Sequence, residues 1–169
     1  MVEMTIYGVS FDLVGKQPIV LLKTAEGNRY LPIWIGHSEA AAILMKLQGA
    51  EAPRPLTHDL LVNILGELDV DVVRVTVTEL RDNTFHASIT VQQNGNEIEI
   101  DSRSSDAIAV AVRAHAPIFA ADEVIDESAI EMEGDEVNEE EIVSEFRSFL
   151  DHVSAEDFAE AEGEADDAD

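Results

Sequence analysis

Two short segments of this chain share an order of residue types that suits anion binding. In each, an arginine precedes a Thr or Ser, then an Asp, and then an apolar run with helical spacing: RPLTHDLL starts at Arg54, and SRSSDAIAVAVR starts at Ser102. A helix N-terminus presents unpaired backbone N–H groups, and a guanidinium beside it can hold two oxygens of a phosphate. The pairing of two such segments in a small domain indicates a shared phosphate site, although ordinary helix capping explains either segment alone.

Individual roles follow from the chemistry of the polar residues. Thr57 and Ser105 are placed to cap the two helices, with Asp59 and Asp106 in their first turns. In the simpler interpretation these residues cap the helices and complement their dipoles, and do no more. In the functional interpretation, the residues assigned to phosphate binding are Arg54, Thr57, Arg103 and Ser105.

A histidine beside a carboxylate can act as a general base, and His58 followed by Asp59 is the one adjacent pair of this kind. Neighbouring residues on a helix point about 100° apart, so His58 also fits a polar residue packed at the helix start. The catalytic candidates are His58, Asp59 and Asp106. Glu39 would join Asp59 and Asp106 as oxygen ligands of Mg²⁺ or Mn²⁺ if three helix starts converge; otherwise each carboxylate complements its own helix dipole.

Hydrophobic periodicity and turn residues predict the elements that carry these groups. Apolar alternation bounded by Gly and Asn predicts strands before and after the first arginine segment, and Ser38 and Gly49 bound a helix after the third strand. Within the first arginine segment's helix, Leu60, Ile64 and Leu68 have the spacing of a buried stripe, which also includes Leu61 and Leu65. The expected strands are 3–14, 18–24, 29–35, 70–80, 85–92 and 97–100, and the expected helices are 38–49, 57–68 and one from Ser105 to about Ala116, before a short extended stretch at 117–119.

The order of these elements predicts an α+β fold in which antiparallel or mixed β-sheets pack against three helices. The domain is expected to span residues 1–125, followed by an acidic linker at 126–137. A C-terminal amphipathic helix at 138–158 and a disordered acidic tail at 159–169 complete the prediction. Self-association is expected because the helices are rich in alanine and the sheet in Ile and Val, with a homodimer as the simplest form.

Acidic residues dominate the composition, with 36 Asp and Glu against 10 Lys and Arg. Residues 1–120 hold 15 acidic and nine basic residues, whereas residues 121–169 hold 21 acidic residues and Arg147 alone among the bases. Such a surface repels nucleic acid and anionic membranes at ordinary salt. The balance resembles that of proteins adapted to molar salt, where screening shortens the Debye length to about 3 Å. With no cysteine, no apolar stretch of membrane-spanning length and no signal-like start, the sequence predicts a cytoplasmic protein.

Common catalytic signatures are missing, including a phosphate-binding loop, a paired-histidine zinc helix and a Gly-x-Ser-x-Gly turn. Three blocks nevertheless resemble, in order and spacing, those of the bifunctional nuclease domain family: LPIWIGHSEAAAI, RPLTHDLL, and SRSSDAIAVAVR followed by PIF. The resemblance covers roughly residues 3–125. Where the family commonly has a proline in the last block, this chain has Ser104, which loosens the helix entry but keeps the charged groups.

The resemblance implies a usually self-associating α+β domain whose relatives degrade RNA and DNA. It points to Glu39, Arg54, Thr57, His58, Asp59, Arg103, Ser105 and Asp106. The working hypothesis is phosphodiester hydrolysis with a divalent metal. One alternative is a non-enzymatic oligomeric module that binds a small phosphorylated ligand, and another is a structural oligomer held by an internal ion-pair network. Open arginines and carboxylates lining a cleft favour the first two, whereas mutual pairing in a closed interior favours the third.

Overall fold

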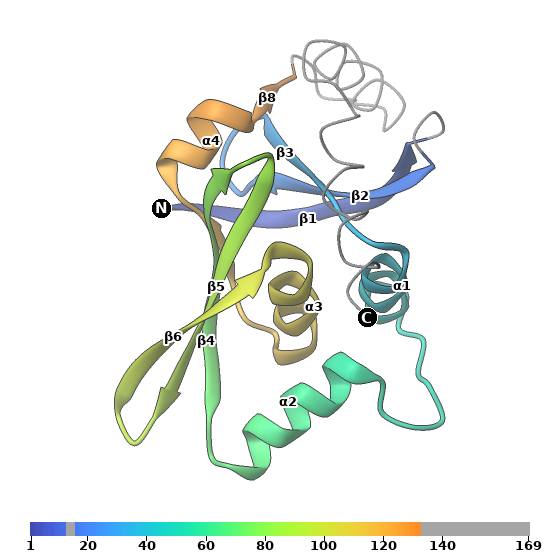
Figure 1. The fold of residues 1–169 in the computed structure, drawn as a ribbon, viewed down its shortest axis with the longest axis vertical. Helices are drawn as coiled ribbons and strands as arrows, with labels where there is room; N and C mark the ends of the chain where they lie inside the picture. The colour runs from blue at the N-terminus through green and yellow to red at the C-terminus, as the bar shows by residue number, and fades with distance from the viewer. Residues whose placement is uncertain (13–15, 133–169) are drawn as a thin grey trace, which may run out of the picture.

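Eight strands form one mixed sheet in the order β6-β5-β4-β7-β1-β2-β3-β8 (Figure 1). The computed structural model describes residues 1–12 and 16–132. Within those ranges β4 and β7 form the one parallel pair, and all other neighbours are antiparallel. The strands are β1 (Val2–Asp12), β2 (Gln17–Thr24), β3 (Arg29–Trp34), β4 (Asp71–Arg81), β5 (Thr84–Gln93), β6 (Asn96–Arg103), β7 (Ile118–Ala120) and β8 (Ile130–Glu131).

Two antiparallel three-stranded units, β1–β3 and β4–β6, make up most of the sheet, as the sequence predicted. Asp82 and Asn83 between β4 and β5, and Asn94 and Gly95 between β5 and β6, all adopt positive φ. Two consecutive positive φ values are typical of the tight turns that match strand twist, and Asn, Asp and Gly tolerate them best. Strand β7 then joins the two units by pairing with both β1 and β4.

Three helices pack side by side on one face of this sheet: α1 (His37–Leu47), α2 (Thr57–Glu67) and α3 (Ser104–Ala114) (Figure 1). The central one, α3, contacts β4 and β5 and lies between α1 and α2. Its residues from Ala107 to Ala111 are at most 1% exposed. The small alanines let α3 approach the sheet closely, so that the arginine segments at the starts of α2 and α3 are held near each other.

The remaining buried side chains divide between the two faces of the sheet. On β2, Val20 and Leu22 point into the main core under the helices, whereas Ile19 and Leu21 point to a second cluster on the opposite face with Tyr30 and Met132. Leu31 and Ile33 of β3, and Ile35 just after it, likewise belong to the main core. The alpha-plus-beta fold predicted from the sequence is therefore confirmed.

The prediction of a buried leucine stripe on α2 is wrong. Leu60, Leu61, Ile64 and Leu68 are 38–59% exposed, and His58 is the one buried residue of the helix. Leucines occupy both sides of this helix, so spacing alone did not identify the side that faces α3. The outer side, together with Leu56, remains open in the described part of the chain.

The prediction that Ser38, Thr57 and Ser105 cap their helices is also wrong. The N-caps are Gly36 for α1, Leu56 for α2 and Arg103 for α3, and none of them makes a side-chain capping bond. The observed N-caps lie two residues before Ser38 and Ser105 and one residue before Thr57, so these three side chains belong to the first turns of their helices. The last predicted boundary, at residue 125, falls within a further helix, α4 (Asp122–Ser128), and β8 then pairs with β3. The folded domain thus continues through Met132, and the predicted helix at 138–158 and tail at 159–169 lie outside the described residues.

Candidate functional site

The N-terminal ends of α1, α2 and α3 converge around a pocket of about 500 Å³, which we call the His58 pocket. Its lining includes both charged or polar and apolar side chains. Its lining residues are Ser38, Glu39, Ala41, Ala42, Met45, Pro55, Leu56, Thr57, His58, Arg103 and Asp106. The fold therefore brings residues of both arginine segments together with Glu39 from the first turn of α1, whereas Arg54 itself lines a neighbouring pocket.

Arg103 links two carboxylates at the mouth of this pocket. Its Nε donates to Asp106 Oδ2 at 2.7 Å, and its Nη2 donates to Glu39 Oε1 at 3.0 Å. The side chain of Arg103 is 67% exposed, whereas those of Glu39 and Asp106 are 17% and 28% exposed. The guanidinium thus faces solvent while its partners are largely covered.

A side-chain hydrogen bond joins the two arginine segments. His58 Nε2 lies 2.9 Å from Asp106 Oδ1, across 48 residues of sequence. The other ring nitrogen, Nδ1, forms no hydrogen bond within the described ranges. The carboxylate partner of His58 is therefore Asp106 and not its neighbour Asp59, in keeping with the divergent directions of adjacent helical side chains.

The environment of Asp106 favours its ionised form. Burial raises the pKa of the carboxyl, but hydrogen bonds from Arg103 and His58 outweigh burial, and the pKa lies below its ordinary value. The hydrogen bond to Asp106 in turn raises the pKa of Arg103. Both groups of this pair are consequently charged at neutral pH.

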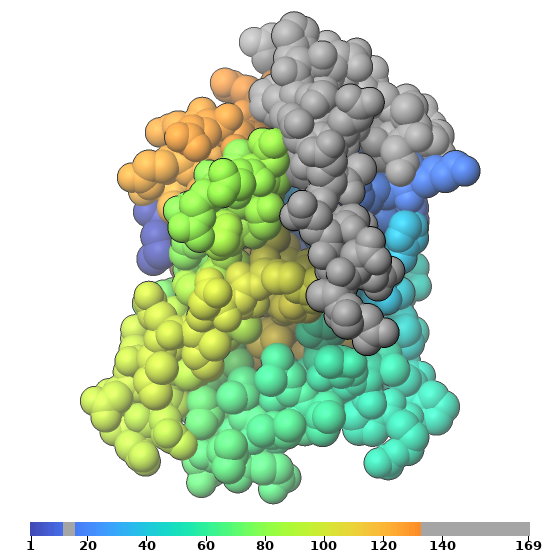
Figure 2. All heavy atoms as spheres, in the orientation of Figure 1, coloured from blue at the N-terminus to red at the C-terminus, as the bar shows by residue number. Residues whose placement is uncertain are grey.

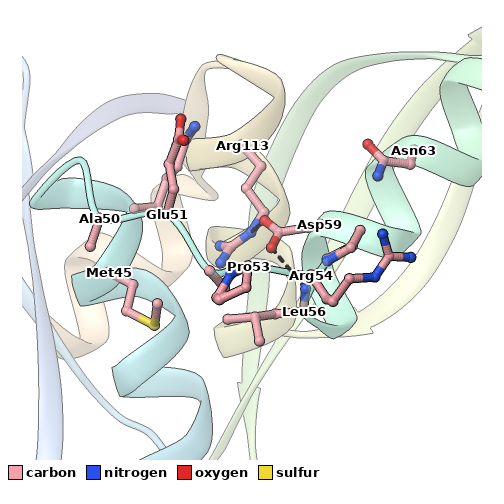
Figure 3. Close-up of a pocket in the computed structure, with 12 residues that line it drawn as sticks. Met45, Ala50, Glu51, Pro53, Arg54, Leu56, Asp59, Asn63 and Arg113 are labelled. Atoms are coloured by element: carbon pink, nitrogen blue, oxygen red, sulfur yellow. Dashed lines mark hydrogen bonds and ion pairs between the residues drawn. The ribbon is translucent and has the colours of Figure 1, made fainter.

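Asp59 lines a neighbouring pocket of about 430 Å³, which we call the Arg54 pocket (Figure 3). Oδ1 of Asp59 accepts a hydrogen bond from Arg113 Nε at 2.7 Å, and Oδ2 of Asp59 accepts one from the backbone N–H of Leu56 at 2.9 Å. The Leu56 hydrogen bond and then that of Arg113 hold the pKa of Asp59 below its ordinary value. Asp59 therefore satisfies the start of α2 and fastens it to α3.

Arg113 is the residue that the sequence analysis missed. Its side chain is only 5% exposed, and besides Asp59 it donates to the carbonyl oxygens of Ala109 and Ala42, both at 3.0 Å. One guanidinium thus connects all three helices. The available signal was a lone arginine in an otherwise apolar helical run, because a buried arginine requires partners.

Arg54, in contrast, is free. Of the six arginines in the described ranges, it is the one that forms no ion pair. Its side chain is exposed, and Figure 3 shows the guanidinium directed away from the Asp59–Arg113 pair. Neither Arg54–Asp106 nor Arg103–Asp59 pairing occurs, so the site combines one closed ion pair with arginines that remain open to solvent.

The other predicted residues are placed less centrally. Thr57 lines the His58 pocket and is exposed, whereas Ser105 is buried and faces a smaller cavity of about 220 Å³ on the other side of Arg103. The described residues contain no group of three or more His, Asp or Glu side chains that could hold a metal ion. Glu39 and Asp106 are bridged by Arg103 while Asp59 binds Arg113, so these three carboxylates, as arranged, do not fit the predicted Mg²⁺ or Mn²⁺ site.

Comparison with known proteins identifies a matching family and several relatives. Residues 20–133 match the bifunctional nuclease domain. Uncharacterized proteins from two strains of Mycobacterium tuberculosis are 40% identical over 163 residues, which is 92% of this chain and 97% of theirs. Bifunctional nuclease 1 of Oryza sativa subsp. japonica is 27% identical over 103 residues, which is 59% of this chain and 31% of the rice protein.

None of the helices in the described ranges is long and apolar enough to cross a membrane.

The matched region includes all three helices of the His58 pocket and every residue that lines it. The chain belongs to the bifunctional nuclease domain family.

Proposed function

We propose that this chain hydrolyses phosphodiester bonds of RNA and DNA in the His58 pocket. The observation that carries the proposal is the hydrogen bond of 2.9 Å between His58 and Asp106, beside a solvent-facing Arg103. A base oriented by a carboxylate, next to a cation open to an anionic substrate, is the arrangement that phosphoryl transfer to water requires.

The state of Asp106 determines which nitrogen of His58 acts. An ionised carboxylate only accepts hydrogen bonds, so in a neutral imidazole Nε2 carries the proton and Nδ1 keeps a lone pair. Nδ1 then takes a proton from the attacking water as the water oxygen bonds to phosphorus. The phosphorus–oxygen bond to the leaving nucleoside breaks, and that oxygen takes a proton from solvent.

Arg103 can bind the substrate without releasing its carboxylates. A guanidinium has five N–H donors, of which Asp106 and Glu39 engage two, so the remaining donors are available to phosphate oxygens. With His58 neutral, Glu39, Arg103 and Asp106 carry a net charge of −1, which weakens binding of the anionic substrate. Proton transfer to His58 removes this excess, so the site favours the transition state over the ground state.

A water nucleophile needs no ribose hydroxyl, which is why one site would serve both RNA and DNA. Asp59 acts in this proposal as a positioning residue, because its contact with Arg113 fixes the turn that bears His58. No step requires the three carboxylates to share a metal. Cleavage that depends on Mg²⁺ or Mn²⁺ would instead support a metal site that draws Asp59 away from Arg113.

The test is cleavage of RNA and of single-stranded DNA in molar salt, with Mg²⁺, Mn²⁺ or chelator. We expect His58→Gln to lower kcat by about 10² or more, as for loss of a general base, and Arg103→Ala to lower kcat/KM. Arg29→Ala is the matched control, because Arg29 forms an exposed ion pair with Asp126 and lines neither pocket. Activity that survives both His58→Gln and Arg103→Ala would contradict the assignment and indicate a contaminating nuclease.

Arg54 also favours a second candidate, a non-enzymatic module that binds a small phosphorylated ligand. An arginine without an ion pair in an acidic chain is a natural anion receptor. The discriminating result is binding of a mononucleotide without cleavage of any nucleic acid by the wild-type protein.

A further inference from the structure

The Arg54 pocket adjoins the His58 pocket, and the two share Met45, Pro55 and Leu56 in their walls. The connection between α1 and α2 therefore forms a ridge with one pocket on either side. Each pocket opens to solvent beside its own arginine, Arg54 in one and Arg103 in the other. A ligand long enough to cross the ridge would contact both arginines.

Charge distinguishes the Arg54 pocket from the rest of the molecule. Lys46, Arg54 and Arg113 line it against Asp59 and Glu51. Because Asp59 and Arg113 neutralise each other, the remaining groups leave a local excess of positive charge. In a chain with a net charge of −26, such an excess in a pocket points to an anionic ligand.

We propose that the Arg54 pocket binds a second phosphate of the same nucleic-acid strand whose scissile phosphate occupies the His58 pocket. This inference rests on the proposed function, because it assumes a nucleic-acid substrate. It narrows that substrate to single strands with at least two phosphates. Arg54 is the main contact, because its guanidinium is unpaired and can hold phosphate in a bidentate manner. Lys46 adds a less directional positive charge.

Two probes separate the pockets by length. The dinucleotide dTpdT has one phosphate, whereas an eight-residue oligodeoxythymidylate reaches both pockets. We expect Arg54→Ala to weaken binding of the octamer about tenfold and to leave dTpdT binding unchanged. The plot of log K against log salt should also change in slope by about 0.7 for the octamer, as for loss of one phosphate contact on a single strand.

Binding is measured by fluorescence anisotropy on the full chain carrying His58→Gln, so that the probes stay intact. Arg29→Ala in the same background is the control, and circular dichroism verifies folding. The proposal of a second phosphate site would be overturned if Arg54→Ala left the affinity for the octamer unchanged. It would also be overturned if Arg54→Ala weakened binding of dTpdT as much as binding of the octamer. Cleavage by the wild-type protein is scored separately: a length-dependent loss of binding without cleavage supports this site and refutes the proposed hydrolysis.

The open side of α2 carries a second, independent inference. Leu56, Leu60, Leu61, Ile64 and Leu68 form what we call the α2 stripe, each 38–59% exposed. Figure 2 shows α2 as a band across the lower surface of the molecule. Adjoining apolar side chains on the open face of a helix typically mark an interaction surface, so we expect this stripe to be covered.

We infer that the α2 stripe is covered by α2 of a second copy of this chain. The exposed side chains present on the order of 400 Å² of apolar surface, about half of the 800 Å² that one partner buries in a typical interface. None of the five residues is charged, so two acidic chains can meet there without placing acid against acid. Strand β8, the last described element, lies at the opposite end of the molecule from α2 (Figure 1).

The test is sedimentation equilibrium in molar salt, where acidic repulsion is screened. We expect the 18.5 kDa chain to sediment as a dimer and the double variant Leu60→Gln, Ile64→Gln as a folded monomer. Ile98→Gln, at an exposed apolar position on β6, is the control and should remain dimeric. Two results would overturn the inference. One is a monomeric wild type, in which case α2 must be covered by something else, such as residues 133–169. The other is a double variant that dimerises as well as the wild type.

Discussion

Replacing Arg113 by Met should destabilise the fold by about 2–3 kcal/mol, and the structure supplies the reasons for this magnitude. Loss of one partner from a buried ion pair typically costs 3–5 kcal/mol. Here the cost is smaller because the two carbonyl acceptors, of Ala42 and Ala109, lie in helices where backbone N–H groups also bond them. Asp59 is 35% exposed and keeps its Leu56 hydrogen bond, and Met preserves the apolar stem.

The pH dependence gives this prediction a sharper test. The pKa of Asp59 is lower in the folded state than its ordinary value of 3.8. Its ion pair therefore stabilises the fold above that value, and the stabilisation disappears as pH falls through the folded pKa. The stability difference between wild type and Arg113→Met should be largest at pH 7 and should shrink below about pH 4.

Urea unfolding at constant high salt, at pH 7 and pH 3, measures both quantities. Arg29→Met is the matched control, because its ion pair with Asp126 is exposed and should contribute less than about 1 kcal/mol. A destabilisation by Arg113→Met no larger than that of the control, or one equal at both pH values, would refute the role assigned to Arg113.

Three further predictions concern the helix starts. Thr57→Ala and Ser105→Ala should each change the free energy of unfolding by less than about 0.5 kcal/mol, because neither side chain caps its helix. Urea midpoints will measure this change, and a loss of about 1 kcal/mol or more would show that the side chain does cap its helix. Gly36→Ala should lower kcat/KM with little loss of stability, because a Cβ there would collide with the Glu39 carboxylate and displace it from Arg103; unchanged kinetics would show that Glu39 is dispensable. The lowered pKa of Asp106 predicts that Asp106→Asn reduces activity by a similar factor at pH 5 and pH 8, and a reduction at only one of the two would contradict ionisation across that range.

Most of the elements up to β7 were predictable because their signals are local, whereas α4 and β8 were not predicted. Asn94-Gly95 fixes one hairpin through backbone conformation alone, and alternation of apolar residues identified strand 29–35 as a strand. The sheet order was not predictable, because β7 has three residues and pairs with strands 40 to 120 positions away. The exposure of α2 was unpredictable for a related reason: a helix that is apolar on two sides gives no internal sign of which side packs.

Part of the lining of the His58 pocket was predictable from the sequence, but the pairing of its residues was not. Sequence order placed Asp59 next to His58, yet α2 directs the two side chains into different pockets. Arg113 escaped notice because its contacts, to Asp59 and Ala42, span 54 and 71 residues. Residue types indicate which groups can interact, whereas the packing of α3 between α1 and α2 decides which of them do.

Among the described residues Arg103 forms ion pairs and Arg54 does not, and this difference follows from how far each arginine precedes the Asp of its own segment. Arg103 precedes Asp106 by three residues, a helical spacing at which side chains meet, and the two pair at 2.7 Å. Arg54 precedes Asp59 by five residues and lies before the helix, and the Asp59 carboxylate binds Leu56 and Arg113 instead. The first arginine is thereby left open to a ligand, while the second is fixed in place with donors to spare. Two segments alike in composition thus supply one cation free to bind a strand and one oriented beside His58.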